Sequence, residues 1–130
     1  MTTLPDHLTI YRSGVASASD CHDPRSIYAE RFWLPQVGPT CWALSRRLSA
    51  ALATQSALEL DTDALARSLG VGRPSGLLAR AFDRLDLLAL GIYEPGRAVF
   101  ALRMLWPPIS PRMLAKLPAE LQAAHPRRTR

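Results

Sequence analysis

The sequence predicts a mainly α fold with a small β wing, because its central part carries three signals in a fixed order. A short apolar strand comes first, two helices joined by a Gly-rich turn follow, and a segment of alternating polarity around a Pro-Gly turn ends the series. A helix-turn-helix followed by a two-stranded wing is a compact way to present one helix to a groove of DNA. The four predicted segments lie at 58–60, 62–69, 75–90 and 92–103.

The predicted helices rest on apolar residues at helical spacing and on signals at the helix ends. In the segment 39–54, apolar side chains recur three and four residues apart, so we expect one buried face, with Arg46 and Arg47 on the solvated side. Asp61 is expected to cap the next helix, and Gly91 to end the last one. These segments therefore predict amphipathic helices around one core.

The chain is expected to form one domain at residues 26–125, with a flexible arm at 1–25 and a basic tail at 126–130. The arm shows little periodicity. A short helix at 26–33 and a C-terminal helical segment interrupted by Pro118 would extend the domain at its two ends. The predicted architecture thus has N- and C-terminal helical extensions.

Composition bounds the class of protein. With 130 residues, of which 48% are hydrophobic, the chain is long and apolar enough to bury a core. No apolar run approaches the roughly 20 residues that a membrane span needs, and the first residues lack the pattern of a secretory signal. We therefore expect a cytoplasmic protein in which Cys21 and Cys41 are free thiols.

The net charge of +5 is concentrated toward the C-terminus, where residues 92–130 carry seven basic and two acidic side chains. Of the 16 basic residues in the chain, all but Lys116 are arginine. A clustered basic surface attracts polyanions through Coulomb attraction and counterion release. Ordinary solvated charge is the alternative interpretation.

Leu65-Ala66-Arg67-Ser68-Leu69-Gly70-Val71-Gly72-Arg73-Pro74-Ser75 resembles the helix-turn-helix of bacterial winged helix-turn-helix transcriptional regulators. Arg80-Ala81-Phe82-Asp83-Arg84-Leu85 extends the resemblance into the recognition helix, and Gly91-Ile92-Tyr93 is similar to the usual exit into the wing. The resemblance covers about residues 36–103 and lies at the level of a superfamily.

This resemblance implies a DNA-binding transcriptional regulator of double-stranded DNA. The helix at about 75–90 would enter the major groove, and the wing at about 92–103 would lie on the DNA backbone. A homodimer on a two-fold DNA site is then plausible, because one such domain makes few base contacts. The residues expected to contact phosphates and bases are Arg73, Ser75, Arg80, Arg84 and Arg97, with Arg103 flanking them.

Two other functions remain open. The apolar run Leu77-Leu78-Ala79 favours a protein–protein interaction module within a larger complex if its side chains are exposed as one patch. An architectural DNA binder that uses charge alone would show no sequence preference. The aromatic residues Tyr28, Phe32, Trp33, Trp42 and Trp106 are expected in the core, with a homodimer interface as the alternative.

Catalytic and metal chemistry find no support in the sequence. Cys21, His22, Cys41 and His125 lack the paired short spacings of structural zinc sites. The Gly70-Val71-Gly72 turn lacks the further glycine and the lysine of a phosphate-binding loop. We therefore expect neither an enzyme nor a bound cofactor or metal.

Overall fold

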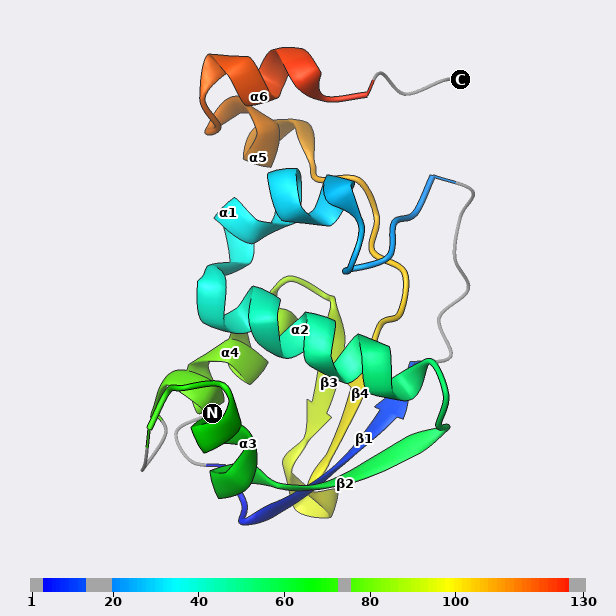
Figure 1. The fold of residues 1–130 in the computed structure, drawn as a ribbon. Coiled ribbons are helices and arrows are strands. Elements are labelled where there is room, and N and C mark those ends of the chain that lie inside the picture. Colours follow the sequence, from blue (N-terminus) through cyan, green and yellow to red (C-terminus); the bar gives the residue numbers. More distant parts are fainter. Residues whose placement is uncertain (1–3, 14–19, 73–75, 127–130) are drawn as a thin grey trace.

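The computed structural model describes residues 4–13, 20–72 and 76–126. Its centre is a four-stranded mixed sheet in the order β2-β1-β4-β3. β1 pairs antiparallel with β2 and parallel with β4, and β4 pairs antiparallel with β3. The strands are His7–Arg12 (β1), Ala57–Asp61 (β2), Gly91–Glu94 (β3) and Val99–Leu102 (β4). Figure 1 shows the strands side by side behind a helical layer.

This topology corrects the prediction of a winged helix-turn-helix. The protein has an α/β fold, because a strand from the N-terminal segment lies inside the sheet, between β2 and the β3–β4 hairpin. The segment His7–Arg12, assigned from the sequence to a flexible arm, is this strand, and its Leu8 and Ile10 are almost fully buried. Two apolar residues in a six-residue strand give a weak local signal, since the pairing partners lie far along the chain.

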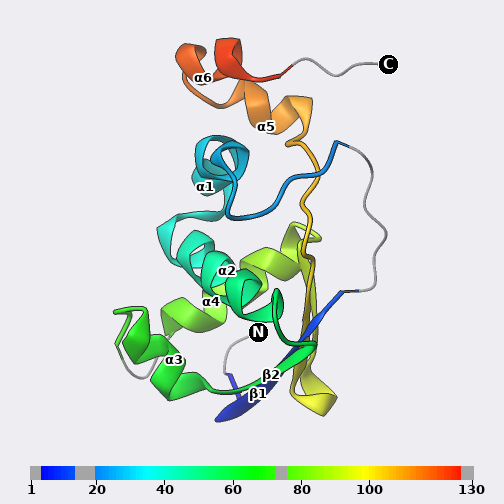
Figure 2. The same cartoon turned by 45° about the vertical axis from the view of Figure 1, so that its right-hand side comes forward.

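Three helices pack on one face of the sheet: Pro39–Leu52 (α2), Thr62–Ser68 (α3) and Gly76–Leu87 (α4). All three lie on the same side of the strands (Figure 2). The apolar stripes of α2 and α4 form one core with the inward side chains of the sheet. The Phe82 and Phe100 rings, for example, pack edge to face with centroids 5.0 Å apart. This interface forms the centre of the hydrophobic core.

The helices predicted from local signals are present, with small shifts in their boundaries. Asp61 caps α3 as predicted, since its carboxylate accepts a hydrogen bond from the Ala64 N–H at 3.0 Å. Gly70 and Gly72 adopt positive φ in the turn after α3, where a side chain would be strained. The predicted stop at Gly91 is wrong, because α4 ends at Leu87 and Gly91 belongs to β3.

A second group of short elements is stacked beyond α2, at the end of the molecule opposite to the β3–β4 connection (Figure 1). It consists of a π-helical turn at Ala29–Trp33, then Leu34–Val37 (α1), Pro111–Ala115 (α5) and Ala119–Ala124 (α6). The indole N–H of Trp33 donates to the Pro107 carbonyl at 2.8 Å, and its ring meets the Trp106 ring edge to face. The expected core role of the aromatics is confirmed for the four that are buried: Tyr28, Phe32, Trp33 and Trp106.

The β3–β4 connection carries a short 3₁₀ turn at Pro95–Arg97. The hairpin predicted around Pro95-Gly96 is therefore present, with Arg97 in the turn. No helix in the described part of the chain is both long enough and apolar enough to cross a membrane.

Candidate nucleic-acid interface

The predicted DNA-contact residues that the structure describes come from α4 and from the two ends of β4. Arg73 and Ser75 are outside the described residues. Arg80 and Arg84 are exposed one turn apart on α4, as their spacing predicts. The Arg84 guanidinium, however, donates through Nη1 to the Gln36 carbonyl at 3.0 Å, so it ties α4 to the end of α1.

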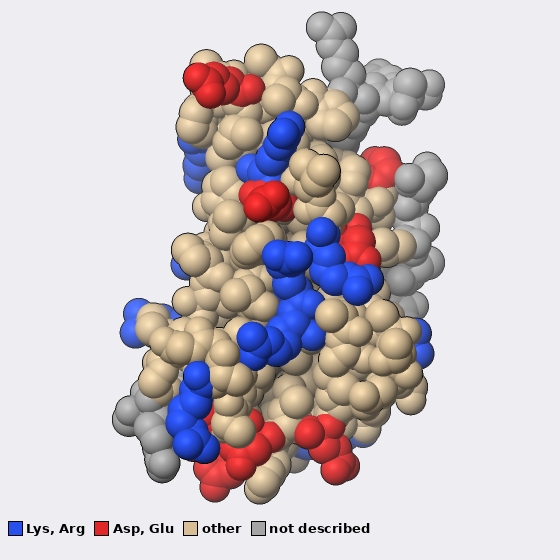
Figure 3. Space-filling view, viewed as in Figure 1, with Lys and Arg blue, Asp and Glu red and all other residues tan. Residues whose placement is uncertain are grey.

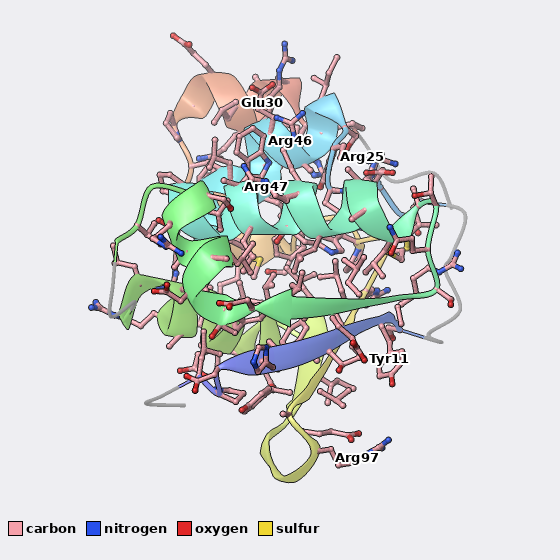
Figure 4. All side chains as sticks on the ribbon, turned by 60° about the horizontal axis from the view of Figure 1, so that its bottom comes forward. Tyr11, Arg25, Glu30, Arg46, Arg47 and Arg97 are labelled. Carbon is pink, nitrogen blue, oxygen red and sulfur yellow. The ribbon has the colours of Figure 1, made fainter. Side chains whose placement is uncertain are left out.

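Arg97 and Arg103 lie at opposite ends of β4. Figure 4 shows Arg97 at the tip of the hairpin, where its Nη1 is 3.2 Å from a Glu94 carboxylate oxygen. Arg103 follows the other end of the strand, and its Nε donates to the Leu105 carbonyl at 2.8 Å. Both guanidinium groups therefore already hold contacts within the chain, and the fold does not gather them with Arg80.

A different group of arginines shares one face of the molecule. Figure 3 shows Lys and Arg side chains in a band across the face that α2 and α3 present, with acidic side chains at both ends of the face and beside the band. We call this surface the arginine face and define it by Arg25, Arg46, Arg47 and Arg67, all of which are exposed. Figure 4 shows that Arg25, Arg46 and Arg47 lie on the side of α2 that faces away from the sheet.

Two arginines of this face are held by neighbouring side chains. The Arg46 guanidinium lies over the Trp42 ring, 4.7 Å from its centroid, in a cation–π contact. The Arg47 Nη1 donates to the Ser68 hydroxyl at 2.6 Å and so links α2 to the end of α3. Both contacts restrict long side chains, which lowers the entropy that a ligand-bound arginine must lose.

The arginines of this face differ in whether a carboxylate pairs with them. Arg25 pairs with Asp23 at 3.0 Å, and Arg67 pairs with Asp63 at 3.2 Å. Among the described residues, no carboxylate lies within ion-pair distance of Arg46 or of Arg47. The uncompensated positive charge of this face is therefore centred on α2, and exposed charges of this kind attract an anionic ligand.

The arginine pair on α2 had a sequence signal. Arg46 and Arg47 lie on the polar side of an amphipathic helix, and the sequence predicts correctly that they are exposed. Their proximity to Ser68 and Arg25 depends on the packing of α2 against other elements, which local periodicity does not contain. The sequence therefore placed the site on α4 and the hairpin instead.

The apolar run on α4 is divided between the core and the surface. Leu78 and Ala79 are buried, whereas Leu77 is 47% exposed. They do not form the single exposed patch that would favour the interaction module. Tyr11, which is 40% exposed, lies on the outer face of the sheet, on the side opposite to Arg46 and Arg47 (Figure 4).

The cysteine and histidine residues considered for zinc occupy different environments. Cys41 is buried on α2, and its thiol donates to the Ala81 carbonyl at 3.4 Å. His22 and His125 both contact Tyr28 at the other end of the molecule. Both cysteines are free, and the described residues contain no group of three or more potential metal ligands.

Comparison of the chain with models of known protein families, with curated proteins and with solved structures finds no significant match. The geometry of the arginine face therefore carries the functional argument. The exposed guanidinium groups of Arg46 and Arg47, each held by a neighbouring side chain, suit the recognition of phosphates, which arginine binds through its planar fork of N–H donors.

Proposed function

We propose that the protein binds double-stranded DNA through the arginine face and acts as a DNA-binding transcriptional regulator. One observation carries the proposal. Arg46 and Arg47 are exposed side by side on α2, each is held by a neighbouring side chain, and the described residues place no carboxylate against either.

Phosphate recognition follows from this arrangement. Each guanidinium that meets a phosphate displaces condensed counterions from the duplex, and their release drives association. Arg25 and Arg67 flank the central pair and can exchange their carboxylate partners for phosphates. The net charge of +5 adds long-range attraction to any polyanion.

The test is fluorescence anisotropy of the full chain with a labelled random-sequence duplex, measured over a range of salt concentrations. Four phosphate contacts predict that log affinity falls against log salt with a slope of about −3.6. The double variant Arg46→Ala with Arg47→Ala should reduce the magnitude of this slope by about 1.8, because two contacts are lost.

The matched control is Arg112→Ala on α5 with Lys116→Ala at the C-cap of the same helix, which removes the same charge from two exposed residues elsewhere. A loss of affinity confined to the α2 variant supports the proposal. Equal losses in the two variants would show that only net charge matters. A loss on Arg80→Ala with Arg84→Ala, and none for the α2 pair, would move the interface to α4 and overturn the assignment.

A selection from a pool of random duplexes tests the regulatory role. Enrichment of one sequence supports a transcriptional regulator, because base contacts then add to phosphate contacts. Binding without enrichment would leave DNA binding in place and replace the regulator by an architectural binder.

A further inference from the structure

Two arginines of the arginine face are paired with carboxylates of the chain, whereas Arg47 meets a hydroxyl. Asp23 and Asp63 supply these carboxylates, at 3.0 and 3.2 Å from their arginines. The Arg47 Nη1 instead donates to the Ser68 Oγ at 2.6 Å. A serine hydroxyl is neutral, but phosphorylation converts it into a strongly negative group. The position opposite Arg47 is therefore one at which a modification of the chain would supply an anion.

The Ser68 hydroxyl lies where a modifying enzyme can reach it. Ser68 is exposed and is the last residue of α3. Its hydroxyl donates to the Leu65 carbonyl, one turn earlier, at 2.8 Å. The chain then continues into a turn in which Gly70 and Gly72 adopt positive φ. Helix ends open locally at a low cost in free energy, so the hydroxyl becomes accessible without unfolding of the core.

We propose that Ser68 is a phosphorylation site and that its phosphate closes the arginine face to DNA. In the reaction, the Ser68 Oγ attacks the γ-phosphorus of a nucleoside triphosphate held by a protein kinase. The new O–P bond replaces the bond from this phosphorus to the oxygen that bridges it to the β-phosphorus. The nucleoside diphosphate leaves, and the hydroxyl proton passes to a base of the kinase. The effect on DNA rests on the proposed function, whereas the contact between this phosphate and Arg47 does not.

Electrostatics favours the phosphate at this position. Phosphoserine carries about −1.5 to −2 charges at pH 7 and three strong acceptor oxygens. At position 68 these oxygens replace the hydroxyl that Arg47 already contacts, and the preceding residue, Arg67, adds a second positive charge. The C-terminus of α3 disfavours a negative group, and the ester no longer donates to the Leu65 carbonyl. Charge-assisted hydrogen bonds from Arg47 offset both costs. The phosphates of DNA then meet an arginine face whose central charge is neutralised.

Phosphorus NMR of the full chain tests the contact with Arg47. Phosphoserine is introduced at position 68 by nonsense suppression, and its second pKa is measured. A neighbouring guanidinium stabilises the dianion, so this pKa should lie below its usual value of about 6, and Arg47→Ala should raise it again. Phosphoserine at position 56 is the control, because Ser56 is exposed in the loop between α2 and β2. Equal pKa values at the two positions would overturn the contact.

Fluorescence anisotropy with the labelled random-sequence duplex tests the effect on DNA. Phosphoserine at position 68 should reduce the magnitude of the slope of log affinity against log salt by about 0.9 to 1.8, because the phosphate takes one or two arginines from the duplex. The same group at position 56 leaves these contacts in place, so the slope should not change. Equal reductions at both positions would overturn the switch. If the unmodified chain binds no DNA, the proposed function fails, and phosphorus NMR still decides the contact with Arg47.

Mass spectrometry of the full chain, isolated from the cells that produce it, tests whether the modification occurs. Cleavage after Arg67 gives a tryptic peptide that begins at Ser68. We expect a fraction of this peptide to carry one phosphoryl group, which fragmentation assigns to Ser68 and which Ser68→Ala removes. A phosphoryl group only on other residues, or on none, would overturn the proposal.

Discussion

The Tyr28 hydroxyl lies 2.7 Å from Nε2 of His125, a residue that follows it by 97 positions. The same hydroxyl accepts a hydrogen bond from the buried Ile109 N–H at 2.9 Å. The tautomer of the His125 ring decides which of the two groups donates in the hydrogen bond between them. The His22 ring stacks on Tyr28 with centroids 3.8 Å apart. One tyrosine thus joins the N-terminal segment to the end of α6.

Removal of this hydroxyl should destabilise the fold. In Tyr28→Phe, the buried Ile109 N–H loses its acceptor, and an unsatisfied buried donor costs about 1–3 kcal/mol. The measurement is the free energy of unfolding in urea. Tyr93→Phe is the control, because the Tyr93 hydroxyl forms no hydrogen bond with the described part of the chain. Equal stability of Tyr28→Phe and wild type would contradict the role of this bond.

The free energy of unfolding should decrease as the pH falls below the range in which His22 is neutral in the unfolded chain. Burial lowers the pKa of His22 below its usual value of 6.5, Asp20 partly opposes this shift, and His125 adds to it. Between the lowered pKa of His22 in the folded protein and 6.5, the unfolded chain therefore binds more protons than the folded protein does. The free energy of unfolding decreases with falling pH in that window. In His22→Phe, which keeps a ring against Tyr28, urea midpoints between pH 8 and pH 5 should depend less on pH.

The two cysteines should differ in reactivity. Burial raises the pKa of the Cys41 thiol to about 12, and the thiolate is the reactive form. Cys21 is only half-buried. Titration of the native protein with a chromogenic disulfide reagent should detect one fast thiol, and titration in urea should detect two. Cys21→Ser should abolish the fast phase. A fast thiol that remains in that variant would show that Cys41 is accessible.

Gly91→Ala should destabilise the sheet. A Cβ at this position would lie 2.3 Å from a ring carbon of Phe100 and 2.9 Å from the Ala101 carbonyl oxygen. Both distances are shorter than contact, and Phe100 is fully buried between the sheet and α4. Overpacking of this kind costs about 1–3 kcal/mol or more. Thermal unfolding should show a lower midpoint for Gly91→Ala than for Gly96→Ala, where a Cβ meets nothing within 4 Å.

The helices could be predicted because their signals are local. The apolar spacing of 39–54 corresponds to α2, Pro39–Leu52, and the Asp61 cap lies at the predicted position. In each case the evidence sits within a few residues of the element, at the distance over which helical hydrogen bonds and caps act. The 3.6-residue period also identifies which arginines face solvent.

The sheet and the contacts between distant elements could not be predicted from local sequence signals. β1 pairs with residues about 50 positions away in β2 and about 90 positions away in β4, so its place inside the sheet depends on the collapse of the whole chain. For the same reason, the arginines predicted as one site on α4 and the hairpin are separated, with Arg84 held by Gln36 and Arg97 by Glu94.

By itself, the sequence determined the helices α2, α3 and α4, the β3–β4 hairpin, the buried aromatic residues and the excess of positive charge. These follow from propensity, period and composition, which act over short distances along the chain. Only the tertiary structure decided the mixed sheet, the place of β1 inside it and the contacts of Arg46, Arg47, Arg84 and Arg97. Those relationships join residues far apart in sequence, and they exist only after the core has packed.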